Sequence, residues 1–347
     1  MAATKHFARR GDCDVTAVSR RRPLDAYGAR FHALDLMDER ACAELAADLR
    51  GVTRVVYAAL YERPGLVAGW FEQEQIETNQ RMLRNLFDPL AAQATDLRHV
   101  TLLQGTKAYG AHAGPIEAPA REDRSERRDV PNFYWAQEDY LREKQRGASW
   151  HWSILRPQVI FGLSIGAAMN LIPAIGVYAA LRKERGEALA YPGGIGPVLE
   201  AVDADLLARA IDWAGSNPVA HEEAFNVTNG DVFVWQNVWP AIADALGMQP
   251  GAHEPERLGE SMPAHAAEWD AARARHGLLS PEIAEFVGES FHYADFCMAH
   301  GAEVAPPSPL VSTIKLRQAG FGEVMDTESM FRKWFALFQE MKLLPPR

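Results

Sequence analysis

The sequence predicts an α/β protein with a Rossmann-like, doubly wound parallel sheet and a smaller, mostly helical C-terminal lobe. Short runs rich in Val, Ile, Leu and Phe alternate with stretches of helical spacing, which is typical of a parallel sheet covered by helices on both faces. Beyond about Gly251 the pattern becomes helical throughout. The chain has 347 residues, of which 48% are hydrophobic and 24% are charged, so it can bury a sizeable core.

The elements of the sheet region follow one another along the first 230 residues. We expect strands at residues 14–19, 30–35, 54–60, 99–104, 150–155 and 225–228, and helices at residues 39–50 and 70–94. Residues 132–139 are expected to open a further helix. Ligands of such folds bind at the carboxyl ends of the strands, so the residues that follow each strand are the candidates for a site.

Two units are predicted: a nucleotide-binding domain at residues 1–250 and a helical, substrate-binding lobe at residues 251–347. A stretch of 18 uncharged residues, 164–181, approaches the length of a membrane span. It contains Pro173, two glycines and an asparagine, and it has no aromatic belt. We therefore expect a buried or substrate-lining helix at about 164–182.

Composition excludes several classes of partner. The formal net charge of −10 argues against nucleic-acid binding, which needs clustered positive charge. Three scattered cysteines without a Cys-x-x-Cys pair predict a reducing compartment and no metal site. The N-terminus lacks the apolar segment of a secretory signal. We expect a cytoplasmic protein that contacts neither membrane nor nucleic acid, and a homodimer is compatible with the sequence.

The N-terminus departs from the usual dinucleotide-binding pattern. That fold normally opens with a strand and a Gly-rich turn, which lets the backbone approach a pyrophosphate. Ahead of the first expected strand there is only Met1–Asp12 with a single glycine, Gly11, and residues 2–9 have the character of the helix that would follow such a turn. We therefore expect the first strand and the turn to be missing, so that residues 14–19 form the second strand of the usual order.

The residues after the next strands still suit a dinucleotide. Ser19, Arg20 and Arg21 close the first expected strand, where an NAD enzyme usually has an acidic residue. Arginine there favours the 2′-phosphate of NADPH, although a solvated basic turn is the alternative. Asp35 follows the next strand at the adenine edge. The small residues before Leu60, among them Ala59, allow close packing against the adenosine.

Candidate catalytic groups follow the strand at residues 99–104. Gln104 ends that strand, so Lys107 is expected to point toward the site. Tyr134 lies near the start of the next helix. The ordinary short-chain dehydrogenase pattern is Tyr followed four residues later by Lys, but Glu138 stands at that spacing here. Lys107 could supply the positive charge from a different element.

Several segments resemble a known family, in the family's order. They are Gln104–Tyr109, Asn132–Asp139, Trp152–Gly162, Ala168–Leu171, Val177–Ala180 and Ala224–Trp235. On these segments the chain is similar to the progesterone 5β-reductase/iridoid synthase-like (PRISE) enone reductases, a subgroup of the extended short-chain dehydrogenases/reductases. Two features depart from the family pattern: the missing Gly-rich turn, and Trp135 where a second tyrosine is often found.

The resemblance implies a role for each matching residue. Tyr134 would be the catalytic tyrosine and Lys107 the catalytic lysine. Arg20 and Arg21 would hold the 2′-phosphate, Asp35 and Leu36 would flank the adenine, and Pro157 and Ile160 would lie beside the nicotinamide. The implied activity is the NADPH-dependent 1,4-reduction of a small enone or enal. A tyrosine hydroxyl and a nearby ammonium would then stabilise the negative charge that develops on the substrate oxygen.

Other functions remain open. The same two residues could serve an NADPH-dependent carbonyl reductase or an epimerase of the same superfamily. A non-catalytic NADP-sensing protein is the alternative from another class, because fold alone does not fix activity. Met169, Tyr178, Phe291 and Tyr293 could belong either to the core or to the wall of the site.

Overall fold

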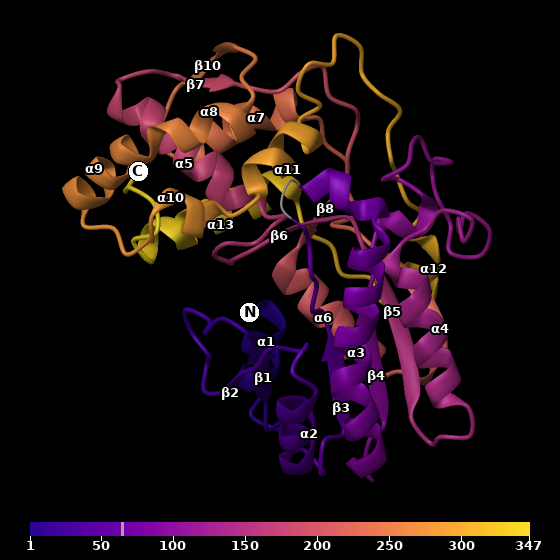
Figure 1. The fold of residues 1–347 in the computed structure, drawn as a ribbon. Coiled ribbons are helices and arrows are strands. Elements are labelled where there is room, and N and C mark those ends of the chain that lie inside the picture. Colours follow the sequence, from indigo (N-terminus) through magenta and orange to yellow (C-terminus); the bar gives the residue numbers. More distant parts are fainter. Residues whose placement is uncertain (64–65) are drawn as a thin grey trace.

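The computed structural model describes residues 1–63 and 66–347. At its centre is a parallel sheet with the order β3 (Arg54–Tyr57), β4 (His99–Leu103), β5 (His151–Pro157) and β9 (Glu223–Val227), seen in Figure 1. Arg54 pairs with His99, and Val100 pairs with Trp152. These strands lie where the sequence pattern placed them. The expected α/β Rossmann-like fold is confirmed.

The sheet is divided rather than continuous. Strands β1 (Thr16–Ser19) and β2 (Arg30–Ala33) form a separate parallel pair, which Figure 1 shows to one side of the central sheet. Within the described residues, β1 pairs only with β2 and β3 pairs only with β4. One edge of β1 and one edge of β3 therefore have no partner strand there.

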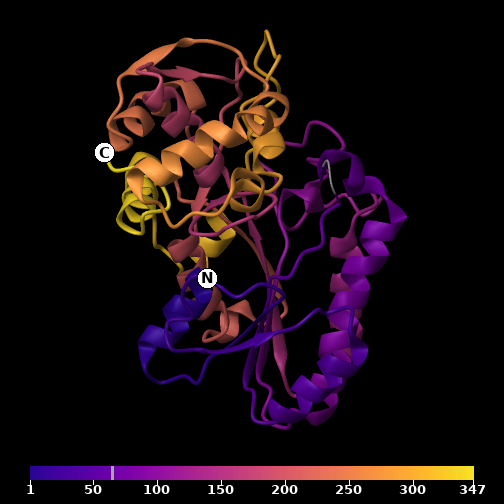
Figure 2. The same ribbon diagram turned by 60° about the vertical axis from the view of Figure 1, so that its left-hand side comes forward.

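Side chains alternate between the two faces of the central sheet, as the geometry of strands requires. Val100, Leu102 and Ile154 pack toward the layer of α2 (Glu39–Asp48), α3 (Gln73–Gln93) and α4 (Phe133–Gln145). Leu103 and Leu155 pack toward α6 (Ala204–Ala214) and α12 (Ile314–Gln318) on the other face. Figure 2 shows the sheet between these two helical layers.

The N-terminal helix belongs to the second of these layers. Helix α1 (Ala2–Arg10) matches the helix expected at residues 2–9 and ends at Gly11, whose φ of 75° suits glycine. It packs against α6 through Phe7 and through two contacts with acidic residues. Lys5 pairs with Asp205 at 3.3 Å, and His6 contacts Asp212 at 2.8 Å.

The remaining elements surround a second, larger core. Two parallel strand pairs contribute, β6 (Val159–Phe161) with β8 (Ala201–Asp203) and β7 (Leu189–Tyr191) with β10 (Pro250–His253). The helices of this part are α5 (Leu171–Glu184), α7 (Trp235–Ala245), α8 (Leu258–Ser261), α9 (Ala266–His276), α10 (Ile283–Val287), α11 (Ser290–Cys297) and α13 (Thr327–Glu340). Short 3₁₀ turns lie at η1 (Leu66–Phe71), η2 (Thr106–Tyr109), η3 (Pro218–Ala220) and η4 (Met262–His265).

Two expectations for this part need correction. The region beyond Gly251 is not wholly helical, because β10 runs to His253 and pairs with β7. The helix expected at about 164–182 begins only at Leu171, because the side chain of Asn170 caps it by accepting from the Ile172 N–H at 3.3 Å. The core holds residues from both sides of residue 250, so the two-unit boundary placed there stays a prediction.

Helix α5 is apolar because it is enclosed by protein. Residues Leu171–Leu181 are all buried in the second core. In the part of the chain that the structure describes, no helix has the length and apolar character to span a bilayer.

One buried carboxyl group makes the stability of this fold depend on pH. Glu200, which precedes β8, accepts hydrogen bonds from the Val311 N–H at 2.8 Å and the Gln158 amide at 3.3 Å. Burial raises the pKa of Glu200 to about 7, and these two bonds oppose that effect. The folded protein therefore binds this proton more tightly than the unfolded chain does, so stability falls as pH rises from about 4.5 to about 7.

We predict that Glu200→Gln removes this pH dependence, because the amide keeps the shape and cannot ionise. The stability of the variant relative to the natural chain should increase by about 3 kcal/mol between pH 4.5 and pH 8. Urea unfolding of both proteins at the two pH values measures this difference. A relative stability that stays constant with pH would contradict the assignment.

Candidate active site

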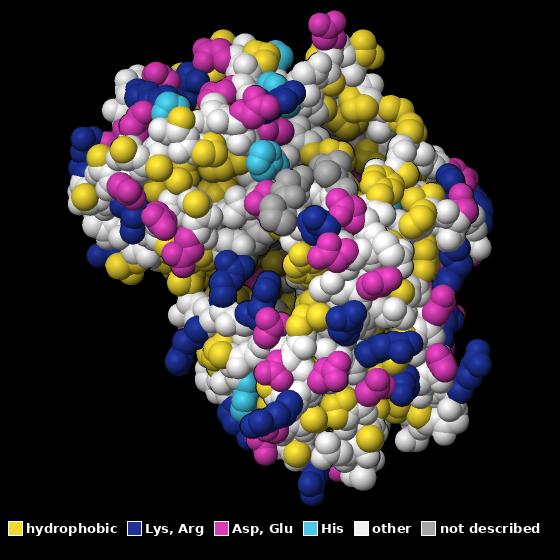
Figure 3. Space-filling model, in the orientation of Figure 1, with side chains coloured by type: hydrophobic (Ala, Val, Ile, Leu, Met, Phe, Trp, Pro, Cys, Tyr) yellow, Lys and Arg dark blue, Asp and Glu magenta, His cyan; other side chains and the backbone are white. Residues whose placement is uncertain are grey.

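Most of the predicted site residues lie at the carboxyl ends of parallel strands. Ser19 ends β1 and Pro157 ends β5, whereas Gln104 follows β4. Lys107 lies in η2, and Tyr134 lies in the first turn of α4. Figure 3 shows a hollow in the surface between the part that holds the central sheet and the part that holds the second core, with Lys and Arg side chains along its lower rim.

Local structure fixes the position of Tyr134. The side chain of Asn132 caps α4 and accepts a hydrogen bond from the Tyr134 N–H at 2.9 Å. The Tyr134 hydroxyl reaches Gly105 so closely that a Cβ at that position would lie 3.1 Å from it, and 3.3 Å from the carbonyl oxygen of Pro157. Glycine at 105 therefore leaves room for the tyrosine hydroxyl between the end of β4 and α4.

The surroundings of Tyr134 keep its hydroxyl protonated. Burial is the main cause that raises the pKa of Tyr134 above its usual range, and the negative charge of Glu62 raises it further. Arg156 acts in the opposite direction. At neutral pH the residue is therefore a neutral phenol that can donate a hydrogen bond.

Lys107 is held in a buried ion pair that the sequence did not predict. Its ammonium lies 3.1 Å from Glu62 Oε1, and the two side chains are only 11% and 4% exposed. The same ammonium lies 4.2 Å from the centre of the Trp70 ring, a cation–π distance. Burial lowers the pKa of Lys107, whereas Glu62 raises it. Glu62 follows β3 and carries no motif of its own, which is why sequence reasoning missed it.

A tyrosine from the C-terminal region also faces this group. Burial raises the pKa of Tyr293 well above its usual value, and Cys297, Tyr134 and Glu62 add to this effect. Tyr293 on α11 is therefore close enough to Tyr134 and Glu62 for both to act on its pKa. It also packs against the second core, to which Phe291 belongs.

Tyr178 belongs to the core as well. Its hydroxyl donates to the carbonyl of Ala190 at 3.2 Å, and its ring is buried in α5. Met169, just before the Asn170 cap, is half-buried. Of the four residues that could have belonged to the core or to the wall, Tyr293 is the one whose pKa responds to Tyr134 and Glu62.

A buried arginine joins the elements that carry these side chains. Arg156 on β5 donates to Gln104 Oε1 at 2.9 Å and to Glu126 Oε1 at 2.6 Å. It also lies 3.4 Å from Glu138 and 3.4 Å from the Tyr109 hydroxyl. Glu138 is fully buried, so the residue at the usual lysine spacing after Tyr134 pairs with this arginine.

The residues predicted for the adenosine end make contacts of their own. Arg21 donates to the carbonyl of Gly166 at 2.9 Å, and Arg20 is exposed. Asp35 accepts from the Met37 N–H at 2.9 Å, and the carbonyl of Leu36 accepts from Asn85.

The other predicted cofactor residues have simple environments. Ala59 and Leu60 follow β3 and are half-buried, and Ile160 is half-buried in β6. Among the described residues, no hydrogen bond or ion pair joins the β1–β2 end to Lys107 or Tyr134. The negative charge of Glu62 raises the pKa of both Lys107 and Tyr134, but no hydrogen bond joins these two residues in the described part of the chain.

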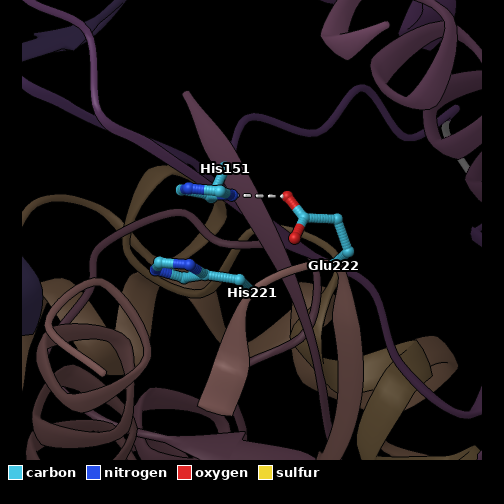
Figure 4. A group of neighbouring side chains, drawn as sticks. All are labelled: His151, His221 and Glu222. Atoms are coloured by element: carbon cyan, nitrogen blue, oxygen red, sulfur yellow. Dashed lines mark hydrogen bonds and ion pairs between the residues drawn. The ribbon is translucent and has the colours of Figure 1, made fainter. Parts of the chain in front are cut away.

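One cluster of potential metal ligands lies at the opposite, amino end of the strands. Figure 4 shows His151 at the start of β5 beside His221 and Glu222, which precede β9. His151 bonds Glu222 at 2.9 Å, and its ring stacks on that of His221 with centres 3.8 Å apart and planes 10° apart. Nearly parallel imidazoles do not aim their in-plane lone pairs at one point, so this arrangement is a histidine stack. That the chain needs no metal stays a prediction.

Comparison with known proteins finds a matching family model and relatives in sequence. The model of the PRISE-like Rossmann-fold domain matches residues 34–345. An (S)-8-oxocitronellyl enol synthase of Nepeta cataria is 32% identical over 312 residues, which cover 86% of this chain and 75% of that protein. A 3-oxo-Δ(4,5)-steroid 5β-reductase of Arabidopsis thaliana is 32% identical over 340 residues, covering 94% and 84%.

Solved structures are similar in fold at low sequence identity. The UDP-glucose 4-epimerase of Thermotoga maritima, solved with UDP-glucose, has a TM-score of 0.67 at 15% identity and covers 97% of this chain and 96% of its own. The UDP-glucose 4-epimerase of Thermus thermophilus, solved with NAD, has a TM-score of 0.60 at 17% identity, with coverage of 97% and 94%. At such identities the likeness shows the fold alone.

We predict that Arg156→Leu strongly destabilises the protein, because it removes the fully buried cation that Gln104, Glu126 and Glu138 share, although Glu138 keeps its exposed arginine partners. The expected loss is about 3–5 kcal/mol in the free energy of unfolding. Arg142→Leu is the matched control, since Arg142 pairs with the same Glu138 from a position 46% exposed. It should cost at most about 1 kcal/mol. Equal losses in the two variants, measured by urea unfolding, would contradict this account.

Proposed function

Since the chain belongs to the PRISE-like Rossmann-fold family, we propose that it is an oxidoreductase that reduces the activated C=C bond of a small enone or enal. Two of its relatives, a steroid 5β-reductase and an oxocitronellyl enol synthase, support this reaction class. The observation that carries the proposal is the Tyr134 hydroxyl, a neutral phenol that lies against Gly105, just after β4 at the carboxyl edge of the sheet.

A nicotinamide cofactor fits the two ends of the site. Arg20 and Arg21 would hold a 2′-phosphate at the end of β1, and Pro157 with Ile160 would border the nicotinamide. Arg21 would have to exchange its bond with the Gly166 carbonyl for the phosphate. No glycine precedes Gly11, so a Gly-rich turn for the pyrophosphate is absent from the sequence. NADPH, when bound, supplies the hydride for conjugate addition.

The protein's own groups would manage the charge that develops on the substrate oxygen. Tyr134 would donate its hydroxyl hydrogen to that oxygen, and Lys107 would add a positive charge nearby. Tyr293 and Trp70 would enclose the substrate and exclude water. We propose that the helical part beyond residue 250, which supplies Tyr293, is the substrate-binding part of the chain.

We expect Tyr134→Phe to reduce turnover about 10²–10³-fold, because it removes one hydrogen-bond donor aimed at the developing charge. The assay offers cyclic enones and small enals with NADPH, and products are identified by mass spectrometry and NMR. Tyr140→Phe is the matched control, since Tyr140 lies on the same helix and its hydroxyl donates to Asp88 on α3. It should retain turnover.

The products separate the alternatives. A saturated carbonyl product supports conjugate reduction, whereas an allylic alcohol indicates a carbonyl reductase. NADPH binding with no turnover of any such substrate would favour a non-catalytic NADP-sensing protein. Full activity of Tyr134→Phe would remove this residue from the mechanism.

A second prediction concerns the choice of cofactor. Replacing both Arg20 and Arg21 by Ala should weaken NADPH binding about 10–100-fold and leave NADH binding nearly unchanged, because charge-assisted bonds to a 2′-phosphate are lost. Fluorescence titration with both cofactors measures this. Arg22→Ala, at a neighbouring exposed arginine, is the control. Equal affinity of the natural chain for NADH and NADPH would contradict the prediction.

A further inference from the structure

Buried amide side chains hold the carboxylate of Glu62 and the backbone around it in place. Gln75 of α3 is 1% exposed and donates to Glu62 Oε2 at 2.6 Å, and its own carbonyl oxygen accepts from the Arg63 N–H at 3.1 Å. Asn79, one turn further along α3 and fully buried, bonds both the N–H and the carbonyl of Tyr61 at 2.9 Å. These bonds fix the backbone on both sides of Glu62.

The same amide network reaches α4, the helix that carries Tyr134. Gln137 donates to the carbonyl of Asn79 at 3.0 Å. With Oε2 of Glu62 satisfied by Gln75, Oε1 remains for the ammonium of Lys107 at 3.1 Å. The loop after β3, helix α3 and helix α4 therefore hold one carboxylate in place, and η2 brings the lysine to it.

We infer that Glu62 is a positioning residue that fixes the ammonium of Lys107 at the site and keeps it charged. Apart from Glu62, the described groups against Lys107 carry no negative charge, although the aromatic rings attract its ammonium weakly. The rings of Trp70 and Phe133 lie 4.2 and 5.8 Å from its nitrogen, and burial lowers its pKa. Glu62 is the one anion that raises it in the part of the chain described.

The other titratable groups described around this pair carry no charge at neutral pH. Burial and the nearby positive charge of Lys107 both lower the pKa of His112, which follows η2. At neutral pH His112 therefore adds no charge. Burial and the negative charge of Glu62 raise the pKa values of Tyr134 on α4 and Tyr293 on α11, so both stay neutral. Among these described groups, the lysine is therefore the one that changes charge on the alkaline side.

Glu62→Gln tests the inference, because glutamine keeps the size and hydrogen-bonding capacity but loses the charge. The chain has seven lysines, so a ¹³C-labelled protein gives few Cε resonances, and Lys107→Met assigns the one of interest. The titration midpoint of Lys107 should fall by about one to three pH units in Glu62→Gln. Glu74→Gln is the control, since Glu74 is 65% exposed and pairs with Arg63 rather than with Lys107.

Enzyme kinetics provides a second readout, and only this one rests on the proposed function. The alkaline limb of the kcat profile should move to lower pH in Glu62→Gln by the same amount as the midpoint, with little change in KM for the enone. If the midpoint shifts but no variant or natural chain reduces an enone, the proposed function fails and the role of Glu62 stands. A folded Glu62→Gln protein with an unmoved midpoint overturns the inference.

Glu62→Asp guards against a variant that does not fold. Aspartate keeps the charge but draws it back by one methylene, so the midpoint should lie between those of the natural chain and Glu62→Gln, with a lower kcat. If Glu62→Gln proves unstable in thermal melts, Glu62→Asp carries the test. An unmoved midpoint together with an unchanged kcat in that variant then overturns the inference.

Discussion

The buried guanidinium of Arg156 is the contact on which the geometry of the site depends. It lies at the end of β5, one residue before Pro157, and it is fully enclosed. An unpaired charge in that position would be very costly, so the chain must bring anions and acceptors to it from other segments. It does so with Gln104 after β4, Glu126 in the following loop and Glu138 on α4. Satisfying one arginine therefore sets the positions of the elements that carry Lys107 and Tyr134.

A second consequence of burial is the charge balance at the site. Lys107 and Glu62 enter the interior together as a neutral pair, and Tyr134 stays protonated beside them. A site with no net charge of its own suits a reaction in which negative charge appears only transiently on the substrate. The lysine then contributes most where that charge develops, because the local dielectric is low and its own partner is fixed.

The sequence pattern predicted the central strands, because their apolar runs are long enough to recognise. Strand β6 (Val159–Phe161) was not predicted, because three residues are too few to show alternation. The place of Lys107 followed from the topology of parallel sheets, whereas the role of Tyr134 was implied by the family resemblance. Glu62 did not, because its pairing with a lysine 45 positions away arises from buried amides on α3 and leaves no local trace. The contact of Arg21 with Gly166 depends likewise on how distant segments pack.

Tyr293 reaches the group formed by Glu62, Lys107 and Tyr134 from far along the chain, and this affects how the protein is made. A ribosome releases the N-terminal part first, and domains fold as their segments emerge. The ion pair and the Arg156 cluster can assemble once β5 has emerged. The wall that Tyr293 provides is added only after α11 has been synthesised. Until then, the nascent chain exposes a half-built site whose aromatic and ionic groups still face water, a stage at which premature association with other chains is most harmful.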